Sequence, residues 1–196
     1  GMTECAPLIA YTPWNEFKIR SCGRIVDRME IKVDSENPQK VVGEIMVKGD
    51  SVMNGYYKNP AATEAVFTED GWMKTGDLGV IDAKGNIFIR GRNKNMILSG
   101  NGQNIYPEEL EDKVNNMPYV IESVVVSRGD KLVALVYADT AAIKKETDKT
   151  PEEIMEMNCA KVNKLIPRFC KINNFELVES EFAKTPKKSI KRFLYS

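Results

Sequence analysis

The pattern of apolar residues changes near residue 91, and this change constrains the fold more than any other feature. Between Arg24 and Gly91, short segments with alternating apolar residues (RIVDRMEIKV, VGEIMVKG and NIFIRG) are separated by glycine, asparagine and aspartate. Alternation of this kind between turn residues is typical of β-hairpins. The stretch from Pro60 to Phe67 is the exception, because a proline followed by alanines favours a helix. The first part of the chain is therefore predicted to be rich in β-structure.

Helical patterns appear after residue 91. Pro107 is followed by two glutamates, and acidic side chains stabilise the first turn of a helix, so a helix is predicted to open there. A second helix is predicted from about Pro151 to Ile166. The polar stretch from Thr140 to Thr150 is predicted to be a solvated loop.

Three strands complete the second part. The segments VIESVVVS and KLVALVYAD flank a predicted turn at Arg128–Asp130, and FELVE from Phe175 is the third strand. Helices packed on a small sheet make a mixed α/β unit, so the whole chain is predicted to be an α+β protein. We expect two domains, residues 1–91 and residues 92–196, with their boundary near Lys94.

Composition excludes several classes of function. Lysine plus arginine equals aspartate plus glutamate at 28 each, and this balance provides no global attraction to nucleic acid or to an anionic membrane. The absence of histidine removes imidazole bases, histidine-containing triads and the commonest metal ligand. The four cysteines form no CxxC pair, so reduced thiols are expected rather than a zinc site or disulfides. We expect a cytoplasmic protein with no transmembrane segment, because no apolar run approaches the roughly 20 residues that span a bilayer.

Three longer motifs follow one another in the chain: SVMNGYYKNPAATEAVF, DGWMKTGDLG and RGRNKNMILSGNGQNIYPEELE. In this order and spacing they resemble adenylate-forming enzymes, the family of acyl-CoA synthetases, luciferases and peptide-synthetase adenylation domains. The resemblance covers nearly the whole chain. It implies that residues 1–91 are the last subdomain, a β-rich distorted barrel, of a large AMP-binding domain that begins upstream in the same protein. Residues 92–196 are then the family's mobile C-terminal domain.

The segment Thr75-Gly76-Asp77 is a candidate nucleotide site. The glycine lets the backbone turn in a predicted loop, and the carboxylate after it can accept two hydrogen bonds from a diol such as ribose. Alone, this tripeptide is more often an ordinary turn. The resemblance assigns Asp77 to the ribose hydroxyls of ATP and of the adenylate. It also places Arg92 on the nucleotide, where a planar guanidinium can reach ribose or phosphate oxygens.

Two further segments gain a role from the resemblance. Lys94 corresponds to the hinge about which the C-terminal domain swings between adenylation and thioester formation. The loop with Gly100, Asn101 and Gly102 is expected to line the channel for the pantetheine of coenzyme A, because its glycines permit close approach of a ligand. A plain connector between elements would have a similar sequence. The form NGQNIYPEELE is most similar to bacterial long-chain fatty acyl-CoA synthetases.

The first residues, Gly1-Met2-Thr3-Glu4, resemble another motif of the family. The resemblance implies that the Thr3 hydroxyl contacts phosphate and that Glu4 ligates Mg²⁺, a hard cation that prefers oxygen ligands. Without that context, a terminal threonine and glutamate would be interpreted as frayed.

The basic tail, FAKTPKKSIKRFLY, departs from the family's pattern. The family carries a lysine that binds carboxylate and phosphate oxygens during adenylation, and this sequence has Ser189 at that register. Lys188 precedes it, so a shift of one residue would present an ammonium whose charge stabilises the crowded oxygens. The simpler interpretation of the same run is a solvated basic tail.

The expected function is that of a fragment of an ATP-dependent fatty acid–CoA ligase. The whole enzyme would use ATP, Mg²⁺ and coenzyme A to convert a fatty acid to acyl-CoA, AMP and pyrophosphate through an acyl-adenylate. The fragment alone is expected to be inactive, because it contains neither a phosphate-binding loop nor an acyl pocket. Two alternatives remain: an adenylation domain or acyl-AMP ligase that loads a carrier protein, and a non-catalytic homologue that binds nucleotide.

Overall fold

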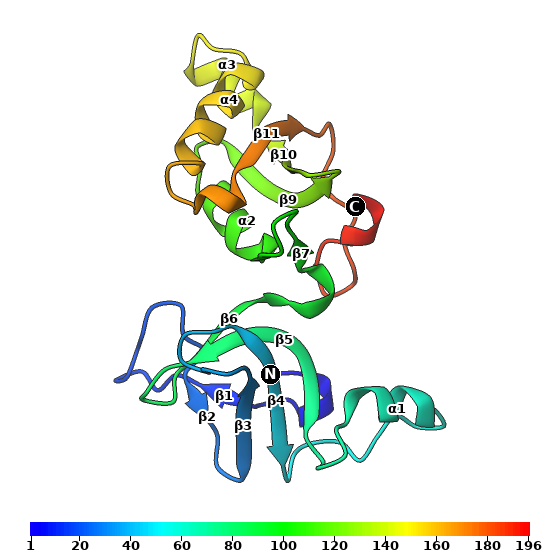
Figure 1. The fold of residues 1–196 in the computed structure, drawn as a ribbon. Coiled ribbons are helices and arrows are strands. Elements are labelled where there is room, and N and C mark those ends of the chain that lie inside the picture. The colour runs from blue at the N-terminus through cyan, green and yellow to red at the C-terminus, as the bar shows by residue number, and fades with distance from the viewer. The chain divides into compact units, whose positions relative to one another are not determined.

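The computed structural model describes all 196 residues, which divide into two compact units, Gly1–Lys94 and Asn95–Ser196 (Figure 1). The division falls three residues after the boundary predicted between residues 91 and 92. That the first unit belongs to a larger domain remains a prediction. Each unit has its own apolar core.

The first unit is built on an antiparallel sheet. Its strands lie side by side in chain order: β3 (Met29–Asp34), β4 (Gly43–Gly49), β5 (Met73–Ile81) and β6 (Ile87–Arg92). A short 3-10 helix and a two-stranded pair precede it: η1 (Thr3–Cys5), β1 (Ala10–Tyr11) and β2 (Arg24–Ile25). The β-hairpins predicted for this part of the chain are therefore confirmed.

The one α-helix of this unit, α1 (Pro60–Val66), lies in the chain between β4 and β5, where the sequence predicts it. Its N-terminus is capped because the Asn59 side chain accepts a hydrogen bond from the N–H of Ala62. Two apolar clusters hold the sheet, one of Cys5, Ile9, Met29, Val47 and Met73 and one of Val33, Ile45 and Ile87.

Strand β5 corrects one prediction, because residues 75–77 lie inside it and not in a loop. Against β4 the register shifts: Glu44 faces Leu78 and Met46 faces Lys74, so β5 carries a bulge here. Gly76 adopts φ 73°, a left-handed conformation that glycine reaches without steric cost. The glycine therefore bends a strand that keeps pairing with β4 and β6 on both sides of the bulge.

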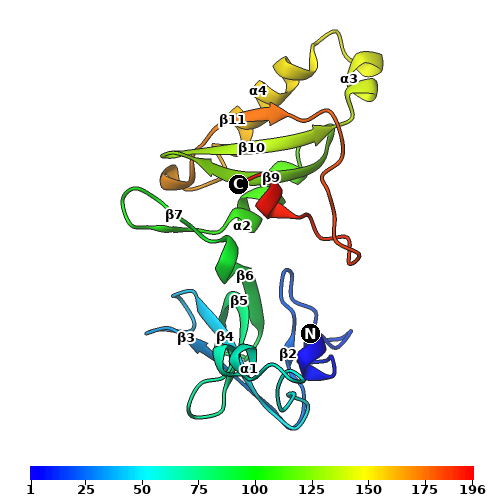
Figure 2. The same ribbon diagram turned by 90° about the vertical axis from the view of Figure 1, so that its right-hand side faces the viewer.

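The second unit is a three-stranded sheet between two layers (Figure 2). Its strands, in the spatial order β11–β10–β9, are β9 (Val120–Arg128), β10 (Lys131–Ala138) and β11 (Ile172–Leu177). β10 is antiparallel to β9 and parallel to β11. The remaining elements of this unit are β7 (Ile97–Leu98), β8 (Asn104–Ile105), α2 (Pro107–Asn115), α3 (Thr140–Glu146), α4 (Pro151–Val162), η3 (Arg168–Cys170) and η4 (Arg192–Leu194). The 3-10 helix η2 (Asn93–Asn95) includes the last two residues of the first unit and the first residue of the second.

Alternate residues of β9 and β10 face opposite layers. Val125, Ala134 and Val136 pack with apolar residues of α2, α3 and α4. Val124, Val126, Val133 and Leu135 pack on the other face against Phe182, with Ile190 and Tyr195 partly buried beside it. The rings of Phe182 and Tyr195 meet edge to face, with centroids 4.9 Å apart. The tail is thus an ordered layer, and its interpretation as a merely solvated basic segment is wrong.

The stretch from Thr140 to Thr150, predicted to be a loop, contains α3. The Asp139 side chain caps this helix by accepting a hydrogen bond of 2.9 Å from the N–H of Ala142. Ile143 is fully buried in the core. Burial of Ile143 and the Asp139 cap therefore stabilise α3, although the polar composition of this stretch does not predict a helix.

Two element boundaries also differ from the prediction. α4 ends at Val162, before Ile166, because the next side chain, Asn163, bonds to both the N–H and the carbonyl of Ile172. β11 begins at Ile172 and not at Phe175. The predicted strand began too late because two asparagines after Ile172 interrupt the apolar pattern. α4 is the longest helix, and none of the helices combines the length and the apolar character needed to cross a bilayer.

Candidate functional site

Asp77 and Arg92, both predicted to contact nucleotide, lie together in the first unit. They face each other across β5 and β6, and the Arg92 Nη1 atom donates to Asp77 Oδ1 at 2.7 Å. The side chain of Asp77 is 28% exposed and that of Arg92 is 48% exposed. A pair this open to water contributes less than about 1 kcal/mol to stability. Because both side chains are partly exposed, a ligand can reach them.

The bulge in β5 is held by the side chains of Thr75 and Glu44. The Thr75 hydroxyl donates to the carbonyl of Ile45 at 2.7 Å and accepts from the N–H of Asp77 at 3.1 Å. The Glu44 carboxylate accepts from the N–H of Gly76 at 3.1 Å. These contacts fix the backbone on which Asp77 is presented. Thr75 belongs to the motif DGWMKTGDLG, whereas no pattern in the sequence marks Glu44, which lies 32 residues before Gly76.

A polar hollow of about 480 Å³ adjoins this pair. It is lined by Thr75, Gly76, Arg92, Asn93 and Lys94. A Cβ added to Gly76 would meet nothing within 4 Å, so the glycine is required for its left-handed φ and not for space. Backbone carbonyl, guanidinium and ammonium groups suit hydroxyl and phosphate groups of a ligand. Lys94 is the last residue before the division between the units, and its role as a hinge remains a prediction.

Thr3 and Glu4 form η1 in the first unit. The Tyr56 hydroxyl donates to Glu4 Oε1 at 3.1 Å, and the N–H of Met53 donates to the Glu4 carbonyl at 2.8 Å. Burial, with the adjacent Glu4 carboxylate, raises the pKa of Tyr56. Tyr56 lies within the first long motif, and its contact with Glu4 joins residues 52 positions apart in the sequence. No cluster of three or more acidic, cysteine or histidine side chains suited to a metal occurs. The role of Glu4 as a ligand of Mg²⁺ remains a prediction.

The predicted pantetheine loop forms the tip of the hairpin between β7 and β8 in the second unit. Gly100, Asn101 and Gly102 are exposed there. The Ser99 hydroxyl donates to the carbonyl of Gln103 at 2.8 Å and fixes the base of the tip. Contact with coenzyme A remains a prediction.

Four turns in the molecule share one hydrogen-bonding pattern. In each, the N–H of the first residue donates to the carbonyl of the fifth, and the N–H of the fourth donates to the carbonyl of the first. The N–H of the fifth residue donates to the side-chain oxygen of the first, in turns 68–72, 82–86, 99–103 and 185–189. The fourth residues are left-handed: Gly71, Gly85, Gly102 and Lys188, with φ of 81°, 81°, 78° and 61°. Lys188 therefore occupies a position that the other three turns give to glycine.

Residues 185–189, called the tail turn below, contain the candidate lysine. The N–H of Thr185 donates to the carbonyl of Ser189, and Lys188 occupies the left-handed position of the turn. The one-residue shift relative to the family's register remains a prediction. Lys187, Lys188 and Ser189 are all exposed. The structure thus presents the Lys188 ammonium from a strained backbone, while its part in catalysis remains a prediction.

Lys188→Gly is expected to raise the free energy of unfolding by about 1 kcal/mol, because a left-handed conformation costs a residue with a Cβ about 1–2 kcal/mol. Gly102→Lys is the matched control in the same unit. A Cβ at Gly102 meets nothing within 4 Å, so its expected loss of about 1 kcal/mol is conformational only. Urea unfolding of the 196-residue chain measures both, and a lower stability for Lys188→Gly would contradict the turn assignment.

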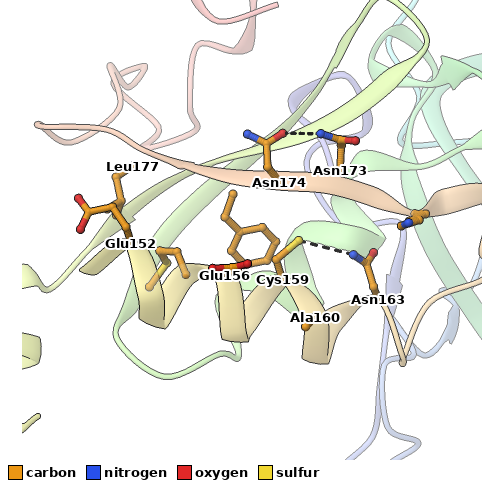
Figure 3. A pocket seen from close by; sticks show the side chains of 11 residues that line it. Glu152, Glu156, Cys159, Ala160, Asn163, Asn173, Asn174 and Leu177 are labelled. Atoms are coloured by element: carbon orange, nitrogen blue, oxygen red, sulfur yellow. Dashed lines mark hydrogen bonds between the residues drawn. The ribbon is translucent and has the colours of Figure 1, made fainter. Parts of the chain in front are cut away.

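The second unit also contains an apolar hollow of about 620 Å³ between α4 and β11 (Figure 3). Met155, Cys159, Phe175 and Leu177 contribute its apolar lining. Asn163 lies at its end and donates to the Cys159 sulfur at 3.5 Å, besides its two bonds to Ile172. None of the predicted site residues lies in this hollow.

Comparison with known proteins identifies the class. Residues 1–57 match the family model described as AMP-binding enzyme, and residues 94–195 match the model of the AMP-binding enzyme C-terminal domain. The chain belongs to this family of AMP-binding enzymes. The family resemblance drawn from the motifs is therefore confirmed.

The chain is similar in sequence to CoA ligases from bacteria. The chain is 30% identical over 214 residues to a long-chain-fatty-acid–CoA ligase of Mycobacterium bovis, covering 98% of this chain and 34% of that protein. It is 44% identical over 152 residues to the sulfoacetate–CoA ligase of Cupriavidus necator, covering 72% of this chain and 30% of that protein. The chain thus spans about a third of the length of these relatives.

A solved structure shows the same fold. The O-succinylbenzoate coenzyme A synthetase of Bacillus subtilis, in complex with ATP and magnesium ion, superimposes with a TM-score of 0.81 at 28% identity. The match covers 98% of this chain and 39% of that one. The predicted α+β class, of the adenylate-forming type, is confirmed.

Proposed function

We propose that the full-length protein is an AMP-forming ligase that joins a long-chain fatty acid to coenzyme A through an acyl-adenylate. The observation that carries this proposal is the match to a long-chain-fatty-acid–CoA ligase along 98% of the chain. Relatives named for sulfoacetate or 2-succinylbenzoate also match, over 72% and 67% of the chain. The acid is therefore the part of the proposal that most needs a direct test.

In this proposal the first unit holds the nucleotide. Asp77 accepts hydrogen bonds from the ribose hydroxyls, and Arg92, already oriented by Asp77, reaches ribose or phosphate oxygens. Thr3 contacts phosphate. Glu4, oriented by the Tyr56 hydroxyl, fits Mg²⁺, because this ion commonly takes one or two carboxylates together with substrate phosphates and water. Bound Mg²⁺ would neutralise phosphate charge as pyrophosphate departs.

The second unit serves both half-reactions. Lys94 acts as the hinge, and the unit presents the tail turn for adenylation and then Gly100, Asn101 and Gly102 for coenzyme A. Lys188 supplies the ammonium that stabilises carboxylate and phosphate oxygens. The 196-residue chain alone is expected to be inactive, and the cytoplasm, where ATP and coenzyme A are available, is the proposed location.

Asp77→Asn in the full-length protein is expected to weaken AMP binding about tenfold to a hundredfold, because hydrogen bonds to a charged acceptor contribute roughly 1.5–3 kcal/mol. Asp70→Asn is the control, since Asp70 is an exposed carboxylate that contacts Thr68 and Lys32. Isothermal titration calorimetry with AMP measures both. Equal affinities for the two variants would remove Asp77 from the site.

The function is tested with the full-length protein, ATP and Mg²⁺ and a panel of palmitate, acetate, sulfoacetate, indoleacetate and 2-succinylbenzoate. ATP/pyrophosphate exchange reports adenylation, and thioester formation is compared between coenzyme A and a phosphopantetheinylated carrier protein. Exchange with palmitate and transfer to coenzyme A are expected. Transfer to the carrier protein alone would favour the carrier-loading alternative, and AMP binding without exchange would favour the non-catalytic one.

A further inference from the structure

Arg192 and Glu111 together occupy the free edge of β9, the end strand of its sheet. The Glu111 carboxylate accepts from the N–H of Val125 at 2.6 Å, and Arg192 Nη1 donates to the Val125 carbonyl at 3.5 Å. Arg192 Nη2 also donates to the Glu111 carboxylate, so each of the two side chains bonds to the other and to the backbone of Val125. An ion pair therefore takes the place that a neighbouring strand would fill.

This pair is largely removed from water. The Glu111 side chain is 11% exposed and that of Arg192 is 20% exposed. Burial raises the pKa of Glu111, while Arg192 and the N–H of Val125 act in the opposite direction. A second carboxylate, Glu108, lies 4.0 Å from Arg192 Nε. Such a pair holds its two elements together strongly, because loss of one partner leaves the other charged and buried.

The pair connects the two layers of the second unit. Glu111 belongs to α2 on one face of the sheet, whereas Arg192 follows the tail turn on the other face. Arg192 stands three residues after Ser189, and the intervening Lys191 donates its N–H to the carbonyl of Ala183. On the other side of the turn, Phe182 is buried against the sheet. Both ends of the tail turn are thus fixed, one by a buried ring and one by Arg192.

We propose that Arg192, held by Glu111 and Val125, is a positioning residue that sets the place of the tail turn for adenylation. This inference rests on the proposed function, in which the turn presents Lys188 to the reacting oxygens. A misplacement of about 1 Å in a catalytic group can cost about a hundredfold in rate. Release of Arg192 leaves Lys188 present and charged but displaces it from the position that the reaction requires.

The test compares variants of the full-length protein. Arg192→Met removes the connection but leaves the buried Glu111 carboxylate without a cation, so the double variant Glu111→Gln/Arg192→Met is included to keep the unit folded. Glutamine can still accept from the N–H of Val125. Arg128→Met is the matched control, because Arg128 forms an exposed pair with Glu176 on the same sheet, at 3.1 Å.

Arg192→Met and the double variant Glu111→Gln/Arg192→Met are both expected to lower kcat for ATP/pyrophosphate exchange about tenfold or more, with the KM for ATP little changed. Transfer from a synthetic acyl-adenylate to coenzyme A is expected to stay near wild type, because that step does not use the tail turn. Arg128→Met is expected to resemble wild type in both steps. Recovery of exchange in the double variant would overturn the proposal, since stability alone would then explain the loss.

Amide hydrogen exchange of the same variants gives a readout that is independent of activity. The N–H groups of Lys188 and Lys191 are bonded to carbonyls of Thr185 and Ala183, and they are expected to exchange faster in the double variant than in wild type. Amides of β10 serve as the reference for global folding. Unchanged protection of the tail would overturn the proposal. If wild type shows no pyrophosphate exchange with any acid, the proposed function fails, and amide exchange alone decides whether Arg192 holds the turn.

Discussion

Lys188→Gly in the full-length protein is expected to lower the rate of ATP/pyrophosphate exchange about a hundredfold to a thousandfold, the usual loss when one group that stabilises a charged transition state is removed. The same change is expected to raise stability, because glycine relieves the left-handed strain at this position. Activity and stability should therefore move in opposite directions. A gain in stability together with a loss of activity would indicate that the lysine is retained for function at the expense of stability.

Ser189→Lys and the double variant Lys188→Gly/Ser189→Lys complete this experiment. The double variant combines glycine at the left-handed position with a lysine at the family's usual register, and it is expected to recover exchange. Full exchange by Lys188→Gly alone would exclude Lys188 from the reaction. No exchange by wild type, with activity gained in Ser189→Lys, would indicate the non-catalytic homologue.

Arg192→Met is expected to lower the free energy of unfolding of the second unit by about 3–5 kcal/mol at pH 8, because it leaves the Glu111 carboxylate buried without a cation. Burial already raises the pKa of Glu111, and removal of Arg192 raises it further. A carboxyl group with a higher pKa in the folded state binds its proton more tightly there than in the unfolded chain. The loss is therefore complete above the folded-state pKa and is relieved as the pH falls through that value.

Urea unfolding of Arg192→Met at pH 8 and at pH 5 measures this dependence. The variant is expected to recover part of the lost stability at pH 5, whereas Glu111→Gln/Arg192→Met should be more stable than the single variant at pH 8 and show little further change. An equal loss at both pH values would exclude the buried charge as the cause.

The strands and most helices could be predicted because their signals are local. Alternating apolar residues identify β3, β4 and β6, and a proline before acidic residues identifies the start of α2. α3 was missed because its stability depends on the burial of Ile143 in a core assembled from distant strands. The bulge at Gly76 was taken for a loop because only the pairing of β4 and β6 on both sides reveals a continuous strand.

The candidate site divides in the same way. Motif resemblance selected Asp77 and Arg92, and the fold brings them into contact across 15 residues of sequence. Tyr56 and Glu111 could not be selected, because their partners lie 52 and 81 residues away and no local pattern marks them. The basic residues before Ser189 make Lys188 a candidate in the sequence. Its left-handed backbone, which three other turns of the same hydrogen-bonding pattern give to glycine, is visible only in the structure.

The ion pair on the edge of β9 also has a consequence for self-association. Val124, Val125 and Val126 form an uncharged run of β-branched residues, and an open strand edge of this kind recruits strands from other molecules. Removal of residues 189–196 from the full-length protein would take Arg192 away from the carbonyl of Val125 and from the Glu111 carboxylate that caps the Val125 N–H. Size-exclusion chromatography with light scattering is expected to show larger species for the shortened protein than for the intact one. The contact of Arg192 with the edge of β9 is therefore expected to oppose self-association of the protein through this strand.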